Sequence, residues 1–168
     1  MQFFSGFQLQ NEHKYFGEFL KESEFTVAGF SYGAIKALKY VLETEKRIDR
    51  LQLFSPAFFQ NKSEKFIRLQ LISFRKNSEL YSQNFFKNIF YPNEILEVEK
   101  VDGKIEELEE LLTFKWSDEV LENIKNRGTE IEVFLGGEDK IIDSQEAREF
   151  FSQFGKVCFL KNRGHFLI

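Results

Sequence analysis

Residues 25–38 have the sequence FTVAGFSYGAIKAL, in which a strand pattern passes directly into a helix pattern. Residues 25–30 form a compact apolar run with a β-branched centre, which is typical of a strand buried on both faces. From residue 32 to residue 43 the apolar side chains recur at helical spacing. Because only Ser31 separates the two patterns, we expect a sharp turn from strand to helix at this residue.

Ser31 lies at the centre of Gly29-Phe30-Ser31-Tyr32-Gly33, which matches the pattern Gly-x-Ser-x-Gly. Glycines at both ends let the chain fold back without a clash, so the serine hydroxyl is raised clear of the sheet. The following helix presents free backbone N–H groups and the positive end of its dipole, which both favour a developing oxyanion. The pattern predicts a nucleophilic serine, and the alternative is a structural turn rich in glycine.

The segments on either side continue the alternation of strands and helices. We expect further strands at residues 2–4, 48–54, 130–135 and 156–160, and helices at residues 11–22 and 143–154. This alternation predicts an α/β protein with about five mostly parallel strands flanked by helices. A length of 168 residues suits a single domain spanning residues 1–168.

Residues 60–126 interrupt this alternation. They contain no clear strand, and we expect helices at residues 63–74, around residues 105–112, and after Ser117. We therefore predict a helical cap of about residues 60–126 that is inserted in the domain.

A nucleophilic serine needs a base, and the chain has two histidines, His13 and His165. In hydrolases with this turn, an acidic residue and then a histidine follow the serine along the chain, an order that His165 fits and His13 does not. His165 follows the last expected strand, where a loop can return the imidazole to Ser31. The alternative is a flexible residue near the C-terminal end.

The acid is expected at the end of the preceding strand, within GGEDKIID, residues 136–143. Asp139 is favoured as the residue that holds the imidazole tautomer and stabilises the imidazolium. Glu138 is the main rival, whereas Asp143 suits the cap of the next helix.

Two backbone N–H groups are needed to bind an oxyanion. One is expected from Tyr32, directly after the serine, and the other from Phe7, in the Ser5-Gly6-Phe7 loop after the first strand. Loss of one such donor typically lowers the rate by about 10²–10³-fold.

The composition argues against several other classes of function. A formal net charge of −4 disfavours nucleic-acid binding. The single cysteine, Cys158, allows no internal disulfide and fits a reducing compartment. The histidines and the cysteine have no metal-ligand spacing and there is no glycine-rich phosphate loop, so we expect neither a metal nor a cofactor. With no signal peptide and no apolar run of membrane length, we expect a cytoplasmic protein without a membrane partner.

At these motifs the sequence resembles the α/β-hydrolase superfamily and, more narrowly, the short pimeloyl-[acyl-carrier protein] methyl ester esterases of biotin synthesis. The matching pieces are Phe3-Phe4-Ser5-Gly6-Phe7, Gly29-Phe30-Ser31-Tyr32-Gly33, Leu53-Phe54-Ser55-Pro56-Ala57-Phe58, Gly136-Gly137-Glu138-Asp139 and Gly164-His165. The chain departs from most members in having Ser5-Gly6 where they have His-Gly, and in having fewer strands before the serine. The resemblance implies a minimal α/β-hydrolase fold.

The resemblance also implies a substrate and a partner. The substrate is a pimeloyl chain that phosphopantetheine attaches to an acyl carrier protein, with a methyl ester at the far end. Attack by Ser31, with His165 as base, would release methanol and leave a free carboxylate. A serine esterase or thioesterase on another acyl substrate is one alternative. A hydrolase fold that has lost catalysis and serves as a binding module is another.

The predicted cap has a strong charge asymmetry. Residues 60–92 hold six basic and two acidic side chains, whereas residues 93–122 hold eleven acidic and three basic ones. Four of the basic residues recur at near-helical spacing: Lys65, Arg68, Arg75 and Lys76. Three apolar residues lie among them: Ile67, Leu71 and Phe74. With the resemblance, the basic face becomes a docking surface for an acidic carrier, and the apolar face a lining for the acyl chain. The alternative is a solvated face paired with the acidic stretch downstream.

Overall fold

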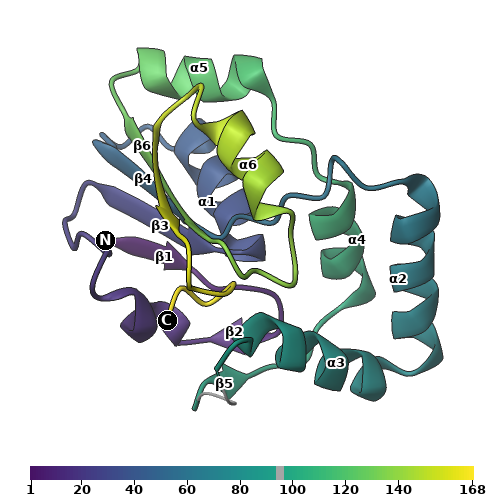
Figure 1. Ribbon diagram of the computed structural model, residues 1–168. Coiled ribbons are helices and arrows are strands. Elements are labelled where there is room, and N and C mark those ends of the chain that lie inside the picture. Colours follow the sequence, from purple (N-terminus) through teal and green to yellow (C-terminus); the bar gives the residue numbers. More distant parts are fainter. Residues whose placement is uncertain (94–96) are drawn as a thin grey trace.

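The computed structural model describes residues 1–93 and 97–168. Its centre is a five-stranded parallel sheet with the strand order β1-β3-β4-β6-β7 (Figure 1). These strands are β1 (Gln2–Phe4), β3 (Thr26–Phe30), β4 (Arg50–Phe54), β6 (Glu130–Gly136) and β7 (Lys156–Leu160). The predicted α/β architecture, with five parallel strands flanked by helices, is therefore confirmed.

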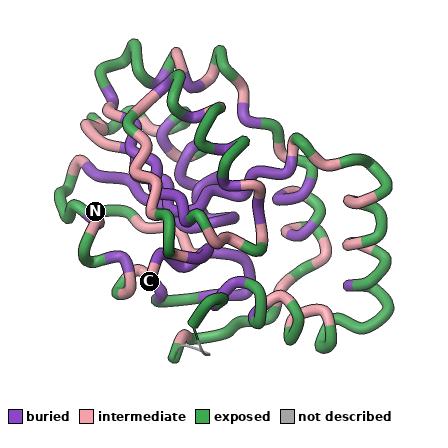
Figure 2. The backbone as a smooth tube through the Cα atoms, in the orientation of Figure 1, coloured by how far each residue is buried: buried purple, intermediate pink, exposed green. Residues whose placement is uncertain are grey.

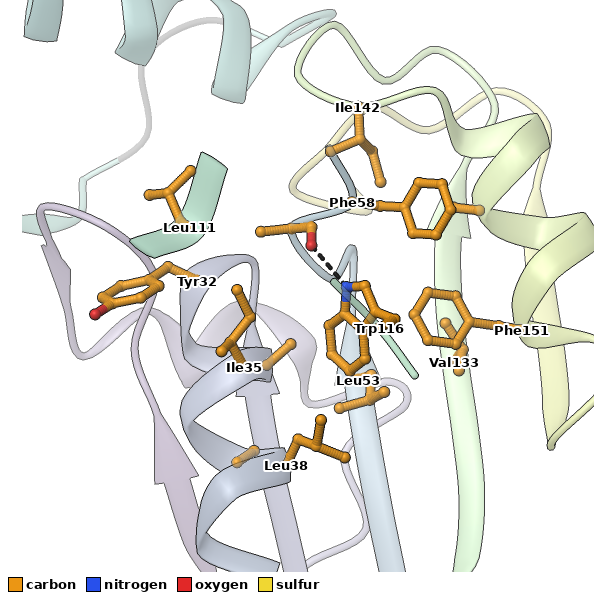
Figure 3. Close-up of a cluster of buried hydrophobic side chains, with 14 of the residues drawn as sticks. Tyr32, Ile35, Leu38, Leu53, Phe58, Leu111, Trp116, Val133, Ile142 and Phe151 are labelled. Atoms are coloured by element: carbon orange, nitrogen blue, oxygen red, sulfur yellow. Dashed lines mark hydrogen bonds between the residues drawn. The ribbon is translucent and has the colours of Figure 1, made fainter. Parts of the chain in front are cut away.

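One face of the sheet is covered by helices: α1 (Tyr32–Glu43), α5 (Asp118–Asn126) and α6 (Ser144–Phe151). Successive side chains of a strand point to opposite faces, so alternate residues belong to different cores. Leu53 and Val133 belong to the larger core together with Trp116 and Phe151 (Figure 3). The Trp116 indole donates a hydrogen bond to the Ala57 carbonyl at 2.8 Å, which fastens residue 116 to the loop after β4.

The opposite face is covered mainly by aromatic rings. Phe54 and Phe134, each one position along from the residues of the first core, pack in a second core with Phe16, Phe30 and Phe166. The Phe16 ring stacks on the Phe54 ring with centroids 4.7 Å apart. Phenylalanine is abundant in both cores, which accounts for the high content of this residue in the chain.

The expected helix at residues 11–22 is wrong. The structure instead has a short 3-10 helix, η1 (Glu12–Phe16), followed by turns. Gly17 follows η1 directly, and glycine is a poor helix former. A few residues later, the Lys21 N–H donates to the side-chain oxygen of Gln52 at 2.8 Å, which draws the chain out of a helical path and across the sheet.

Three further helices stand beside the sheet (Figure 1): α2 (Glu64–Lys76), α3 (Ser78–Phe90) and α4 (Ile105–Thr113). Phe74 is the buried residue of α2, and most of that helix is exposed (Figure 2). α3 has no counterpart among the expected helices.

The expectation that residues 60–126 lack a strand is also wrong, because β5 (Glu99–Lys100) pairs antiparallel with β2 (Leu9–Gln10). A strand of two residues carries no pattern of its own and forms only where a distant segment pairs with it.

Within residues 1–93 and 97–168, no helix combines the length and the apolarity needed to cross a bilayer.

The start of α1 lies so close to β1 that only glycine fits at residue 33. A Cβ on Gly33 would lie 1.9 Å from the Phe4 carbonyl oxygen, a backbone atom that cannot move unless β1 shifts. We expect Gly33→Ala to lower the free energy of unfolding by about 3 kcal/mol, measured by urea denaturation. Gly17→Ala is the matched control, since its Cβ would meet only the Lys14 carbonyl oxygen, at 3.8 Å. The control should change stability by less than about 0.5 kcal/mol. Equal losses in the two variants would contradict this account.

Candidate active site

Ser31 lies on a strained turn between β3 and α1. Its backbone has φ 53° and ψ −114°, a combination that residues with a side chain rarely adopt. Gly29 makes the turn fit, because a Cβ there would lie 2.2 Å from the Gly33 carbonyl oxygen. The Ser31 N–H donates to the Phe54 carbonyl at 2.9 Å, so the residue is fixed to the end of β4 after it has left β3. The sharp turn predicted from the sequence is present.

The structure brings Ser31, His165 and Asp139 into one hydrogen-bonded row. His165 Nε2 lies 3.0 Å from Ser31 Oγ, and His165 Nδ1 lies 2.6 Å from Asp139 Oδ2. The side chains of His165 and Asp139 are 0% exposed, so water does not compete for these bonds. The three residues follow different strands, and they converge because the carboxyl ends of parallel strands share one edge of the sheet.

Asp139 is the carboxylate that reaches the imidazole. Its Oδ1 atom accepts hydrogen bonds from the N–H groups of Ile141 and Ile142, at 2.7 and 3.1 Å. These two bonds hold one oxygen in the turn after β6 and leave Oδ2 for His165. Because two backbone N–H groups hold Oδ1, the carboxylate is kept in one orientation, with Oδ2 directed at the imidazole.

The neighbouring carboxylates have other environments. The Glu138 N–H donates to the Arg163 carbonyl at 2.9 Å, and the Glu138 side chain forms no hydrogen bond with the part of the chain that the structure describes. Asp143 accepts from the Glu146 N–H at 3.0 Å and caps α6, as expected. Across residues 1–93 and 97–168, no three His, Cys, Asp or Glu side chains gather where they could hold a metal ion.

The loop that carries His165 is held by a residue that sequence reasoning missed. The Ser55 hydroxyl donates to the His165 carbonyl at 2.7 Å, and both residues are buried. This bond fixes the backbone on which the imidazole is mounted, since breaking it would leave a buried carbonyl unsatisfied. Its only sequence signal is the Ser55-Pro56 pair at the end of an expected strand. The loop also packs closely against the end of β6, since a Cβ on Gly136 would lie 2.1 Å from the Gly164 carbonyl oxygen.

The N–H groups of Phe7 and Tyr32 are unpaired among the described residues. Tyr32 begins α1, and the first N–H groups of a helix have no partner inside it. The loop that contains Phe7 lies against the same helix start, because a Cβ on Gly33 would lie 2.6 Å from the Ser5 carbonyl oxygen. Phe7 and Ser31 line one cavity. The loop of Phe7 and the start of α1 therefore both lie near Ser31, and the role of their N–H groups as oxyanion donors stays a prediction.

A cavity of about 660 Å³ opens at Ser31 and extends between α2, α3 and α4. This volume is typical of sites for small organic ligands. Four of the lining residues are phenylalanines: Phe7, Phe59, Phe66 and Phe85. Three leucines from α4 complete the apolar wall: Leu108, Leu111 and Leu112. Polar side chains line most of the rest of the cavity: Gln70, Ser73, Lys76, Asn77, Tyr81, Asn84, Asn88 and Lys140. The cavity therefore combines an apolar wall with polar groups, mainly from α2 and α3, and it reaches the serine hydroxyl.

The expectation about which face of α2 lines this cavity is wrong. The three apolar residues expected there pack against the larger core instead: Ile67, Leu71 and Phe74. α2 turns Phe66, Gln70 and Ser73 toward the cavity. The reason is that α2 packs on α3 and α4 rather than on the sheet, so its most apolar face is used for helix packing and the neighbouring face is left for the cavity.

The acidic stretch that follows pairs with α1. Glu107 of α4 lies 3.5 Å from the Lys36 ammonium, and Glu110 binds both the Lys39 ammonium and the Tyr32 hydroxyl. Burial, together with the bond to Glu110, raises the pKa of Tyr32. Burial acts to raise the pKa of Glu110 as well, but the bonds from Lys39 and Tyr32 outweigh it and hold that pKa below its ordinary value. These contacts fix α4, a wall of the cavity, to the helix that begins next to Ser31.

The basic residues of α2 take no part in that pairing. All four are exposed, and none has an ion-pair partner within the described ranges: Lys65, Arg68, Arg75 and Lys76. Lys76 also reaches the cavity wall. α2 therefore presents free positive charge on its outer side and part of the cavity on its inner side.

The chain has the α/β-hydrolase fold, in a form with a small sheet. Among solved structures it is similar to an esterase from Exiguobacterium antarcticum, with a TM-score of 0.56 and 16% identity over 83% of this chain and 59% of that one. It is similar to a bromoperoxidase from Bacillus anthracis, with a TM-score of 0.62 and 15% identity over 84% of this chain and 60% of that one. BioG from Haemophilus influenzae gives a TM-score of 0.61 and 9% identity over 98% of this chain and 87% of that one.

The chain thus spans less than two thirds of the esterase and of the bromoperoxidase. At these identities the likeness shows the fold alone. No protein-family model and no curated protein sequence matches the chain.

Removing the charge of Asp139 tests the geometry of the row. We expect Asp139→Asn to slow the reaction of Ser31 with a fluorophosphonate probe by about 10⁴-fold, because an amide favours the wrong imidazole tautomer. Glu138→Gln is the matched control one residue away, and it should react within about threefold of the wild-type rate. Labelling is followed by mass spectrometry of the intact protein. Similar rates for the two variants would show that Asp139 does not orient His165.

Proposed function

We propose that this chain is a serine esterase that acts through a covalent acyl-enzyme. The observation that carries the proposal is the buried row of hydrogen bonds from Ser31 through His165 to Asp139, which ends at a cavity with one apolar wall. Ser31 is the proposed nucleophile, and His165 is the base and then the acid. Asp139 holds the imidazole tautomer and stabilises the imidazolium.

The proposed cycle begins when Ser31 Oγ attacks the ester carbonyl carbon and His165 Nε2 takes the hydroxyl proton. The negative charge moves to the carbonyl oxygen, where the N–H groups of Phe7 and Tyr32 are the proposed donors. The tetrahedral intermediate expels the alcohol, which receives its proton from His165. A water molecule then gives a proton to His165 and attacks the acyl-enzyme, and Ser31 recovers its proton as the acid leaves.

The test of this activity uses the purified chain and a small soluble ester. We expect hydrolysis of p-nitrophenyl butyrate and covalent labelling by a fluorophosphonate, both abolished in Ser31→Ala while its circular dichroism stays unchanged. A folded wild-type chain that neither hydrolyses the ester nor takes up the label would overturn the proposal. That outcome would favour the alternative of a hydrolase fold that serves only for binding.

We further propose the substrate: the methyl ester of pimeloyl-acyl carrier protein, cleaved to pimeloyl-acyl carrier protein and methanol in biotin synthesis. Support comes from the resemblance of the sequence motifs and from a cavity with room for a chain of methylene groups. Further support comes from α2, whose cations have no ion-pair partner in the described part of the chain and lie on the same helix as part of the cavity wall. The proposal places the protein in the cytoplasm, needs no metal or cofactor, and has the acyl carrier protein as partner.

The products distinguish this substrate from other acyl substrates. Mass spectrometry of methyl pimeloyl-carrier after incubation should show a carrier lighter by the mass of one CH₂, and shorter and longer diester analogues should react more slowly. Release of the whole acyl chain from the carrier thiol would identify a thioesterase instead. An unchanged carrier, in a preparation that hydrolyses the soluble ester, would point to a different acyl substrate.

Charge reversal on α2 tests the docking of the carrier. We expect the double variant Arg68→Glu, Arg75→Glu to lower kcat/KM for carrier-bound ester by about 10²-fold, because two favourable charge contacts become repulsive. Hydrolysis of p-nitrophenyl butyrate should change by less than about twofold, since neither residue lines the cavity.

The matched control is Lys46→Glu, Lys125→Glu, which makes the same change in net charge. Lys46 precedes β4 and Lys125 precedes β6, so both lie toward the edge of the sheet opposite Ser31. If this control lowers carrier activity as much as the α2 variant does, the effect is one of total charge and α2 is not the docking face.

A further inference from the structure

The carboxyl group of Glu12 is buried without the partners that a carboxylate normally has. Glu12 is 0% exposed, and its Oε1 atom accepts a hydrogen bond from the Gly6 N–H at 2.7 Å. Its Oε2 atom is buried as well and has no partner among the described residues. Glutamate is almost never fully buried unless it is paired, because loss of hydration is costly. The proposed catalytic row does not use this residue.

The bond partner of Glu12 lies one residue before a proposed oxyanion donor. Gly6 precedes Phe7, whose N–H has no partner among the described residues and whose side chain lines the cavity. The Gly6 carbonyl accepts from the Leu9 N–H at 3.2 Å, so both peptide groups that flank Gly6 are held. The orientation of the Phe7 N–H follows from these two bonds, because that N–H belongs to the same peptide plane as the Gly6 carbonyl.

The backbone around Asn11 places Glu12 beside the loop of residues 5–7. Asn11 has φ 61°, a left-handed conformation that reverses the chain after β2 and starts η1. The Asn11 side-chain amide donates to a Glu99 carboxylate oxygen at 2.5 Å, and β2 pairs with β5 beside it. These contacts are distant in the sequence, so the position of Glu12 is set by tertiary structure.

Packing alone does not account for a carboxyl at this position. A methionine or leucine side chain would fill similar space with no desolvation cost, but it would leave the Gly6 N–H without its acceptor. Burial raises the pKa of Glu12, against the lowering effects of the Gly6 N–H, the Glu12 backbone and the Ser5 side chain. The carboxyl is therefore protonated more readily than usual, and a glutamine side chain is close to it in shape and in its accepting oxygen.

We propose that Glu12 is a positioning residue, which holds the Gly6 peptide so that the adjacent Phe7 N–H points at the oxyanion of the reaction. This inference rests on the proposed esterase function. Glu12 does not touch the substrate and acts only through the loop of residues 5–7.

Two substitutions separate positioning from packing. Glu12→Met keeps the length of the side chain and removes the acceptor, and we expect kcat for p-nitrophenyl butyrate to fall by about 10²-fold, as on loss of an oxyanion donor. KM should stay within about threefold, because the ground-state ester does not need that donor. Glu12→Gln keeps the accepting oxygen and should retain kcat within about fivefold of wild type. A purely structural role predicts no such split between kcat and KM.

Amide hydrogen exchange supplies a readout that needs no activity. The Gly6 amide should be protected in the wild type and in Glu12→Gln, and should exchange at least about tenfold faster in Glu12→Met. If Glu12→Met does not fold, Glu12→Asp takes its place, since its shorter side chain keeps the charge but does not reach the Gly6 N–H.

Three results would overturn the inference: an unchanged kcat in Glu12→Met, a loss in Glu12→Gln as large as in Glu12→Met, or unchanged exchange of the Gly6 amide. If the wild type hydrolyses no ester, the esterase proposal fails by itself. The exchange rate of Gly6 then decides alone whether Glu12 holds the loop.

Discussion

Between β3 and α1 the chain reverses with no side chain in the way, because glycines stand at residues 29 and 33. Gly29 lies against the Gly33 carbonyl, and Gly33 lies against the Phe4 carbonyl at the end of β1. Backbone packed directly on backbone leaves the residue between the glycines one conformation, and Ser31 takes it at φ 53°. The strain is maintained because the sheet and α1 would have to separate to relieve it.

The other parts of the candidate site are likewise placed by backbone contacts. Asp139 is held by two N–H groups of its own turn, and His165 by the Ser55 hydroxyl at its carbonyl. The Asp139 bonds are local and the Ser55 bond is long-range, and together they leave each side chain little freedom to turn away. Such a prearranged site suits a reaction whose charge develops only in the transition state.

The sequence predicts the sheet and the row of three side chains because their signals are local. Each strand is an apolar run, and Ser31, Asp139 and His165 each lie where such a run ends. α3 was not predicted because some of its amide side chains face the cavity rather than bulk water. Its polar and apolar residues are therefore not separated into the two faces that mark a helix in the sequence. β5 depends on pairing with β2. The cavity face of α2 and the bonds of Ser55 depend in the same way on segments that only the folded chain brings together.

The link between α4 and α1 differs in kind from the contacts within the row of Ser31, His165 and Asp139. Lys36 and Glu107, at 39% and 33% side-chain exposure, lie where dissolved ions reach them, and Lys39 and Glu110 are similarly open. Mobile counter-ions weaken exposed pairs of this sort and leave buried ones nearly untouched. Salt in the solution therefore weakens the ion pairs that hold the cavity wall, but it has little effect on the buried hydrogen bonds of the row. Ionic strength therefore acts on how firmly α4 is attached to α1, and under the proposed function on how tightly an acyl chain is enclosed, while the buried row of Ser31, His165 and Asp139 is insulated from it.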